Sequence, residues 1–233
     1  VLSGLLPGGG GHARPRPEVA LTALQLAGDS GTQGHLVTPQ GEWDVTWPLP
    51  GLYNAYNALA ALSAALALEL EPEQALGPLA DFQAAFGRLE RVPAQDRTIL
   101  IALVKNPVGA GQVLGMLTQS DGERGFLFIL NDRIADGTDV SWIWDADFEA
   151  LAGHVAFAVA AGTRAGDMAL RLKYAGVPED RLVVQRTLDA ALDSALARTP
   201  PGGTLYLLPT YTAMLEVRAL LARRGHVAPF WED

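Results

Sequence analysis

The feature that most constrains the fold is an alternation of short apolar runs with amphipathic stretches, which begins at Arg97. The apolar runs are TILIALV, GFLFIL, HVAFAVA, RLVV and TLYLLP. Each has the length and the aliphatic or aromatic content of a buried strand. The segments between them, 109–120, 165–175, 188–198 and 212–224, have helical spacing. This alternation predicts an α/β fold with a Rossmann-like, mostly parallel sheet and helices on both faces.

The N-terminal part follows a different pattern. Residues 19–27 predict a strand, and residues 34–47 predict a hairpin that turns at 39–41. Residues 48–86 are rich in alanine and leucine and predict two helices, separated at Glu71-Pro72-Glu73 because proline suits a first helical turn.

The polar, proline-containing segment 88–97 predicts a domain boundary. We therefore expect two domains, residues 1–91 and residues 92–233. The chain begins with valine rather than methionine, so we expect the sequence to be N-terminally incomplete.

Composition excludes several classes of function. The formal net charge of −9 argues against a protein that binds nucleic-acid phosphates. Absence of cysteine excludes disulfides and Cys-ligated zinc, and the four histidines show no ligand spacing, so we predict no metal site. The most apolar run, 58–68, is too short to span a bilayer, and no signal peptide is recognisable, which predicts a cytoplasmic location.

Three loops follow predicted strands at the sheet edge where α/β proteins bind ligands: 105–111, 130–151 and 162–167. Each is compatible with a tight turn and a helix cap. The motif GAGQVLG, Gly109–Gly115, with Asp132 after the next strand, is similar to a dinucleotide fingerprint but has GxGxxxG spacing. The alternatives are a stand-alone (di)nucleotide-binding module and glycines that let a helix pack closely on the sheet.

The second loop is unusually acidic. LNDRIADGTDVSWIWDADFEAL, 130–151, has six acidic residues, one arginine and two tryptophans. We expect Trp142 and Trp144 to anchor it by burial, and residues 147–152 to form a helix. Asp145 or Asp147 either caps that helix or presents a rigid carboxylate that orients an imidazole or binds an ammonium group.

Four motifs together resemble one family. PLPGLYNAYNALAA (48–61) and FGRLERV (86–92) resemble the central domain and interdomain element of Mur-type peptide ligases. KNPVGAGQVL (105–114) and LNDRIADGTDVSWIWDADFE (130–149) are similar to the C-terminal domain of the ligase-like subunits of lipid II isoglutaminyl synthases. The resemblance implies that 1–91 is the C-terminal part of a Mur-ligase central domain, with its phosphate-binding loop upstream of Val1.

The resemblance also implies an activity. Such subunits use ATP and Mg²⁺ to activate the α-carboxylate of D-glutamate in the stem peptide of lipid II, at the inner face of the membrane. A GatD-like glutamine amidotransferase supplies ammonia and forms a heterodimer with the ligase subunit. Phosphorylation makes a carboxylate oxygen a leaving group that ammonia displaces. Without the phosphate-binding loop we expect this chain alone to be inactive.

The resemblance assigns roles to seven residues. Asp145, or else Asp139, is implied to complete the Cys-His pair of the glutaminase by accepting the histidine N–H. The remaining five are implied to lie near the nucleotide (Asn54, Asn57, Arg88) or to face the closed active site (Lys105, Asn106). The family's zinc ribbon should fall at residues 5–18, which contain no cysteine, so no zinc is predicted.

Overall fold

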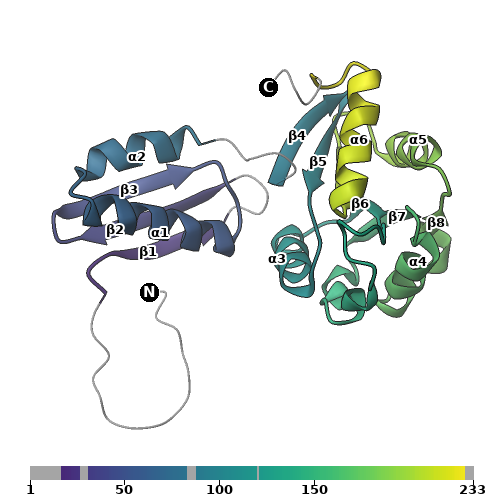
Figure 1. Cartoon of the computed structure of the whole chain (residues 1–233), viewed down its shortest axis with the longest axis horizontal. Coiled ribbons are helices and arrows are strands. Elements are labelled where there is room, and N and C mark those ends of the chain that lie inside the picture. The colour runs from purple at the N-terminus through teal and green to yellow at the C-terminus, as the bar shows by residue number, and fades with distance from the viewer. Residues whose placement is uncertain (1–16, 27–30, 83–87, 120, 229–233) are drawn as a thin grey trace, which may run out of the picture. The chain divides into compact units, whose positions relative to one another are not determined.

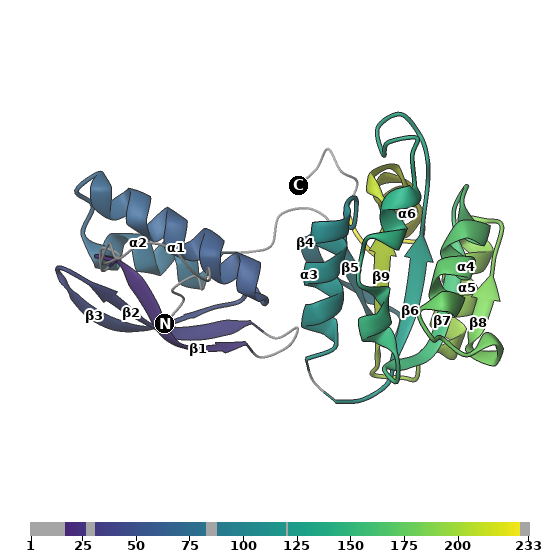
Figure 2. The ribbon, with the colours of Figure 1, turned by 90° about the horizontal axis from the view of Figure 1, so that it is seen from below.

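The computed structural model describes residues 17–26, 31–82, 88–119 and 121–228. They belong to two compact units, Val1–Gln83 and Ala84–Asp233, and Figures 1 and 2 show the elements of each unit from two directions. Residues 1–16, where most of a zinc ribbon would fall, lie outside the described residues.

The first unit is a small sheet covered by two helices. Strands β1 (Ala20–Leu26), β2 (Thr32–Thr38) and β3 (Gly41–Trp47) form an antiparallel sheet in sequence order. Helices α1 (Leu52–Ala67) and α2 (Pro72–Ala80) lie on one face of it (Figure 2). Pro72 begins α2, and Glu71 and Gln74 form a capping box there. The predicted strand, hairpin and helix break are confirmed.

The second unit contains a six-stranded sheet in the order β4-β5-β9-β6-β7-β8. Its strands are β4 (Arg88–Ala94), β5 (Arg97–Ala102), β6 (Arg124–Ile129), β7 (Val155–Ala161), β8 (Leu182–Val184) and β9 (Thr204–Pro209). Strands β5 to β9 are parallel, and β4 pairs antiparallel with β5 at one edge. The five apolar runs are therefore the five parallel strands, as predicted.

Helices cover both faces of this sheet, as the α/β pattern predicts. On one face pack α3 (Pro107–Leu117), α4 (Ala165–Tyr174) and the short 3-10 helices η1 (Ser141–Trp144) and η2 (Phe148–Leu151). On the other pack α5 (Leu188–Arg198) and α6 (Tyr211–Arg223), and the single turn η3 (Glu179–Arg181) precedes β8. Successive residues of each strand enter opposite cores, because side chains alternate along a strand: Phe126 and Phe128 face one, Leu127 and Ile129 the other.

The segment 88–97 does not link two domains. It forms strand β4 and the turn into β5, inside the second unit. Its polarity reflects an edge strand, and Glu90 on that strand pairs with Arg218 of α6 at 2.5 Å. The two compact units divide between Gln83 and Ala84 instead.

Candidate functional site

A polar network lies at the carboxyl ends of β6, β7 and β9, and its centre is Asn131. The Asn131 side chain is buried, and its Nδ2 donates to Oγ1 of Thr212 at 3.0 Å. Its Oδ1 accepts a hydrogen bond from the main-chain nitrogen of Thr163 at 3.0 Å. The main-chain nitrogen of Asn131 donates to Oγ1 of Thr210 at 3.1 Å. One amide thus connects the loops that follow three neighbouring strands.

Asp132, next in the chain, is held by the loop after β7. Its carboxylate accepts hydrogen bonds from Oγ1 of Thr163 at 2.8 Å and from Arg164 at 3.3 Å. The Thr163 hydroxyl, followed by Arg164, holds the pKa of Asp132 below its usual value. The Asp132 carboxylate therefore already accepts hydrogen bonds within the protein, so fewer of its acceptor positions remain for a ribose hydroxyl.

The tip of the acidic loop is fixed to α6. The Asp136 carboxylate accepts hydrogen bonds from the main-chain nitrogen of Thr212 at 2.7 Å and from its hydroxyl at 2.5 Å. Arg133 pairs with Glu216 of the same helix at 2.5 Å. Asp136 therefore caps the N-terminus of α6 from a distant part of the chain.

Beyond this anchored tip the chain presents Asp139 and Asp145 at the two ends of η1. One oxygen of Asp139 accepts the main-chain N–H of Ser141 at 2.8 Å, and this bond lowers the pKa of Asp139. Asp145 ends η1, where its main-chain nitrogen donates to the carbonyl of Trp142 at 3.1 Å. The Asp145 side chain is exposed, and no group within the described residues pairs with its carboxylate. Asp145 is thus available to an external donor.

The two tryptophans of this segment differ. Trp142 is partly buried and packs against the core, as predicted. Trp144 remains 49% exposed, so the expectation that it anchors the loop by burial is wrong. Its ring instead lies 5.4 Å from the guanidinium of Arg171 and packs edge-on against Tyr174 at 5.9 Å.

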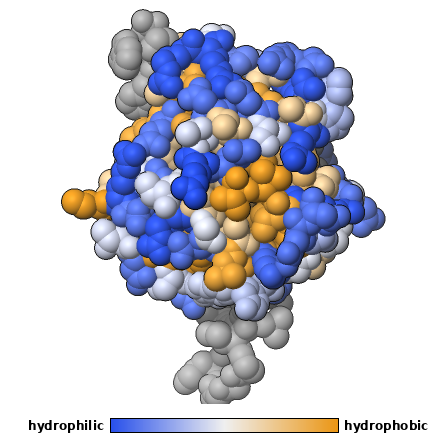
Figure 3. Space-filling view, turned by 90° about the vertical axis from the view of Figure 1, so that its right-hand side faces the viewer, coloured by the Kyte–Doolittle hydropathy of each residue, from blue (hydrophilic) through white to orange (hydrophobic). Residues whose placement is uncertain are grey.

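Other apolar side chains are exposed near Trp144. Tyr174 and Leu170, one turn apart on α4, are 69% and 49% exposed. Figure 3 shows the side of the second unit that carries α4 and β8, where an apolar area is surrounded by hydrophilic residues. Asp145 therefore comes directly after Trp144, whose exposed ring lies beside α4.

The helix predicted at 147–152 is only the single 3-10 turn η2. Asp147 precedes η2 and makes no side-chain capping bond there, and Asp145 ends η1 instead of starting η2. Capping of this turn therefore explains neither carboxylate.

The three nucleotide-side candidates lie in both units, two on α1 and one at the start of β4. Asn54 is buried, and its Nδ2 donates to the carbonyl of Pro50 at 2.7 Å, which fixes the start of α1. Asn57 lies one turn later and is exposed. Arg88 is the first residue of β4, and its side chain lies outside the described residues. Of the described candidate side chains, that of Asn57 is the one that presents an exposed amide.

Lys105 and Asn106 follow β5, and both are exposed. The Asn106 side chain accepts the main-chain N–H of Gly109 at 2.7 Å and so caps α3. Gly109 and Gly111 lie inside α3, neither with a positive φ, so they do not form the turn of a dinucleotide fingerprint.

The alternative role for these glycines is also wrong. A Cβ on Gly111 or Gly115 meets no atom within 4 Å, so neither glycine is needed for close packing of α3 on the sheet. The GAGQVLG motif therefore supports neither the stand-alone nucleotide module nor a tight helix–sheet contact.

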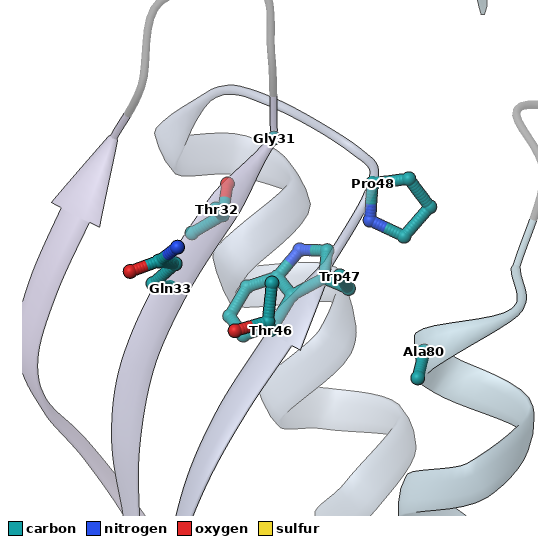
Figure 4. A pocket seen from close by; sticks show the side chains of 7 residues that line it. All are labelled: Gly31, Thr32, Gln33, Thr46, Trp47, Pro48 and Ala80. Atoms are coloured by element: carbon teal, nitrogen blue, oxygen red, sulfur yellow. The ribbon is translucent and has the colours of Figure 1, made fainter.

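Two hollows occur away from the predicted residues. In the first unit a hollow of about 320 Å³ lies at the ends of β2, β3 and α2 (Figure 4), and the buried Nε1 of Trp47 has no hydrogen-bond partner among the residues that the structure describes. In the second unit a hollow of about 430 Å³ lies at the amino ends of the strands, beside Arg124 and Tyr206. Neither is lined by any of the seven predicted site residues.

Neither a metal-ligand cluster nor a membrane-spanning helix occurs within the described ranges. Within them no three histidine or acidic side chains converge as ligands of a metal ion. Nor do they include a helix with the length and hydropathy that a membrane crossing requires.

Sequence reasoning missed Asn131 and Arg171. A signal for Arg171 existed, because it falls at a buried position of α4 between Met168 and Leu172 on the apolar face. Arginine there predicts a fully bonded guanidinium. No local pattern distinguishes Asn131, whose partners lie 32 and 79 or more residues away.

Comparisons with known proteins agree with this architecture. The model of the family "MurT ligase C-terminal" matches residues 103–214, which include the whole acidic loop and the network around Asn131. The MurT subunit of lipid II isoglutaminyl synthase (glutamine-hydrolyzing) from Streptococcus pneumoniae is 34% identical over 210 residues, 90% of this chain and 46% of that protein. The subunit of the same name from Staphylococcus aureus is 34% identical over 176 residues, 75% of this chain and 39% of that protein. The chain thus spans less than half the length of these relatives.

Solved structures show the same fold. A crystal structure of MurF from Acinetobacter baumannii aligns with a TM-score of 0.65 at 24% identity, over 88% of this chain and 45% of that one. Folylpolyglutamate synthase from Mycobacterium tuberculosis, complexed with ADP, aligns with a TM-score of 0.65 at 22% identity, over 88% and 48%. Its family match, its relatives and its fold together place the chain in the MurT branch of the Mur ligase family.

Proposed function

We propose that this chain serves as the ligase subunit of a glutamine-hydrolysing lipid II isoglutaminyl synthase. The complete enzyme converts the α-carboxylate of D-glutamate in the lipid II stem peptide to an amide, with ATP, Mg²⁺ and ammonia released from glutamine by a GatD-like partner. It works in the cytoplasm at the inner face of the membrane. The names of the two MurT relatives and their identity over most of this chain support the proposal. The first unit, 1–83, belongs to the central, nucleotide-binding domain, and the second unit, 84–233, is the domain that contacts the partner.

The observation that carries the proposal for the second unit is the free carboxylate of Asp145. An aspartate that completes a catalytic triad accepts the histidine N–H, fixes the tautomer and stabilises the imidazolium that forms. That role requires a carboxylate that is exposed, unpaired and held by rigid main chain. Asp145 meets the first two requirements among the described residues, and η1 with its buried Ile143 meets the third.

Asp139 is the second choice for the same role. It is exposed, but one oxygen already accepts the Ser141 N–H. That bond stabilises the ionised form and lowers the basicity that favours a strong bond to an imidazolium. Asp145 is therefore the better triad member, and Asp139 the residue that shapes the start of η1.

The test measures glutaminase activity of the complex between this chain and its GatD-like partner. We compare the unsubstituted chain with Asp145→Asn, Asp139→Asn and the control Asp147→Asn. Asp147 is a matched control because it is an exposed carboxylate that directly precedes η2. The dissociation constant of the complex is measured for each. We expect Asp145→Asn alone to lower kcat, on the order of 10⁴-fold as for other triad aspartates, with the complex intact. Unchanged hydrolysis in an intact Asp145→Asn complex contradicts the assignment, and a loss confined to Asp139→Asn transfers the role to Asp139.

A further inference from the structure

The side chain of Arg171 is buried although it is charged. It projects from α4 into the core beneath η1 and η2, and its exposed fraction is 2%. A buried guanidinium persists only where its N–H groups are satisfied, because desolvation of an unpaired charge is costly. The groups that satisfy it therefore show what it stabilises.

Two of those groups are main-chain carbonyls on either side of Asp145. Nε of Arg171 donates to the carbonyl of Ile143 at 2.8 Å, and an Nη atom donates to the carbonyl of Ala146 at 2.9 Å. The same guanidinium contacts Glu149 at 2.6 Å. Because its donors form a planar, rigid fork, the guanidinium fixes both carbonyls at once.

Two aromatic rings enclose the guanidinium. It lies 5.4 Å from the ring centre of Trp144 and 5.1 Å from that of Phe148. Arg171 thus contacts the residues immediately before and after Asp145, together with a residue from each 3-10 helix. Because the main chain is held on both sides of Asp145, its side chain can move only by changing its own rotamer.

We propose that Arg171 is a positioning residue for Asp145, and through it for the histidine of the glutaminase partner. The inference rests on the proposed function, because it concerns the carboxylate assigned there. Arg171 holds the turn at 143–146 in the orientation that directs the carboxylate outward. Displacement of a catalytic group by about 1 Å can lower a rate by about 100-fold, so loss of this brace lowers kcat more than it weakens the complex.

The experiment tests Arg171→Met, Arg171→Lys and Glu149→Gln, each alone, in the complete complex. Arg171→Met is also made in the Asp145→Asn background. Methionine fills space without donating to the carbonyls, and lysine retains a charge but not the fork. Glu149→Gln loosens the guanidinium from its exposed side, so it tests the same brace where Arg171→Met fails to fold. The control is Arg181→Met, which also removes an arginine bound to a carboxylate and a carbonyl, those of Glu123 and Val155, at the amino ends of β6 and β7.

We expect Arg171→Met to lower the glutaminase kcat about 10- to 100-fold, with the KM for glutamine and the dissociation constant of the complex changed less than about threefold. Arg171→Lys and Glu149→Gln should retain more activity, and Arg181→Met should leave it unchanged. In the Asp145→Asn background Arg171→Met should lower kcat no further, because a residue that acts through Asp145 has nothing left to position. Hydrogen exchange of the amides at 143–147 should become faster in Arg171→Met and Glu149→Gln.

The outcomes separate the two proposals. If Asp145→Asn lowers kcat but folded Arg171→Met and Glu149→Gln complexes retain full activity, the positioning role is overturned while the proposed function stands. Additive losses in the double variant also overturn it. If Asp145→Asn leaves hydrolysis unchanged, the proposed function of that carboxylate fails and the inference fails with it, whatever the exchange rates show.

Discussion

Thr212 donates both its main-chain N–H and its hydroxyl to the carboxylate of Asp136, although 76 residues separate the two in sequence. The pair joins the tip of the acidic loop to the first turn of α6. Because the loop tip is fixed in this way, the position of the segment between the tip and η1 is constrained at its first residue. The rigidity of the Asp139–Asp145 segment therefore depends on a helix that comes much later in the chain.

Replacing Asp136 with alanine should lower the free energy of unfolding of the second unit by about 1–2 kcal/mol, because a helix N-terminus loses its cap. Chemical denaturation measures the loss, and hydrogen exchange should show faster exchange at residues 132–140. Asp147→Ala is the control, since Asp147 is exposed and makes no capping bond. Equal stabilities of the two variants would show that the Asp136 bonds contribute nothing net.

Asn131→Asp should destabilise the second unit by about 3 kcal/mol. The substitution removes the amide N–H groups that donate to Thr212 and places a buried negative charge near Glu216, whose carboxylate lies 3.5 Å from Nδ2. Denaturation of this variant is compared with that of Gln112→Glu, the same chemical change at an exposed position of α3. A loss for Asn131→Asp within 0.5 kcal/mol of the control, about the scatter of surface substitutions, would refute the role of the buried amide.

Two glycines should respond to alanine in opposite directions. Gly162 has a φ of +94°, and a Cβ there would lie 2.4 Å from the carbonyl oxygen of Leu130, so Gly162→Ala should destabilise by about 2–4 kcal/mol. Gly111 lies inside α3 with open space around its Cβ position, so Gly111→Ala should stabilise by about 0.5–1 kcal/mol. Thermal unfolding checks both, and a loss of stability in Gly111→Ala would show a close neighbour that the structure does not place there.

His35 should titrate above its ordinary pKa of 6.5. Its Nδ1 lies 2.8 Å from Asp44 and its Nε2 lies 3.1 Å from Glu42, and these carboxylates, Asp44 foremost, raise the pKa of the imidazole. Because the folded pKa is the higher one, the stabilisation is fully present below about pH 6.5 and is lost as pH rises through the folded pKa.

An NMR titration of the His35 ring gives the midpoint directly. Asp44→Asn should return the midpoint further toward 6.5 than Glu42→Gln does, in the order of their contributions. A midpoint at or below 6.5 in the unsubstituted chain would show that the two carboxylates do not act on this ring.

Sequence patterns predicted the elements of the second unit well, because each parallel strand is a short apolar run such as GFLFIL and each helix has its own periodicity. They placed the domain boundary within 88–97, whereas the two units divide between Gln83 and Ala84. Arg88–Ala94 is polar because β4 is an edge strand, and edge strands and linkers have similar compositions.

The candidate site was predictable only as a loop. Its acids, its tryptophans and its place after a strand are local features, and the family resemblance singled out Asp145 among them. The exposure of Trp144 was not predictable, because the ring packs on the guanidinium of Arg171 from a later helix. Nor was the network of Asn131, whose partners come from two other loops. Such features depend on tertiary contacts that neither periodicity nor composition encodes.

The position of β9 affects how the second unit folds during synthesis. This strand follows all the others in the chain, yet it lies between β5 and β6. Until residues 204–209 have left the ribosome, the hairpin β4–β5 and the trio β6–β7–β8 share no strand, and β5 and β6 each keep one edge without its final partner. The nascent unit therefore exposes unpaired strand edges to chaperones and proteases until this late segment joins the two groups in one step.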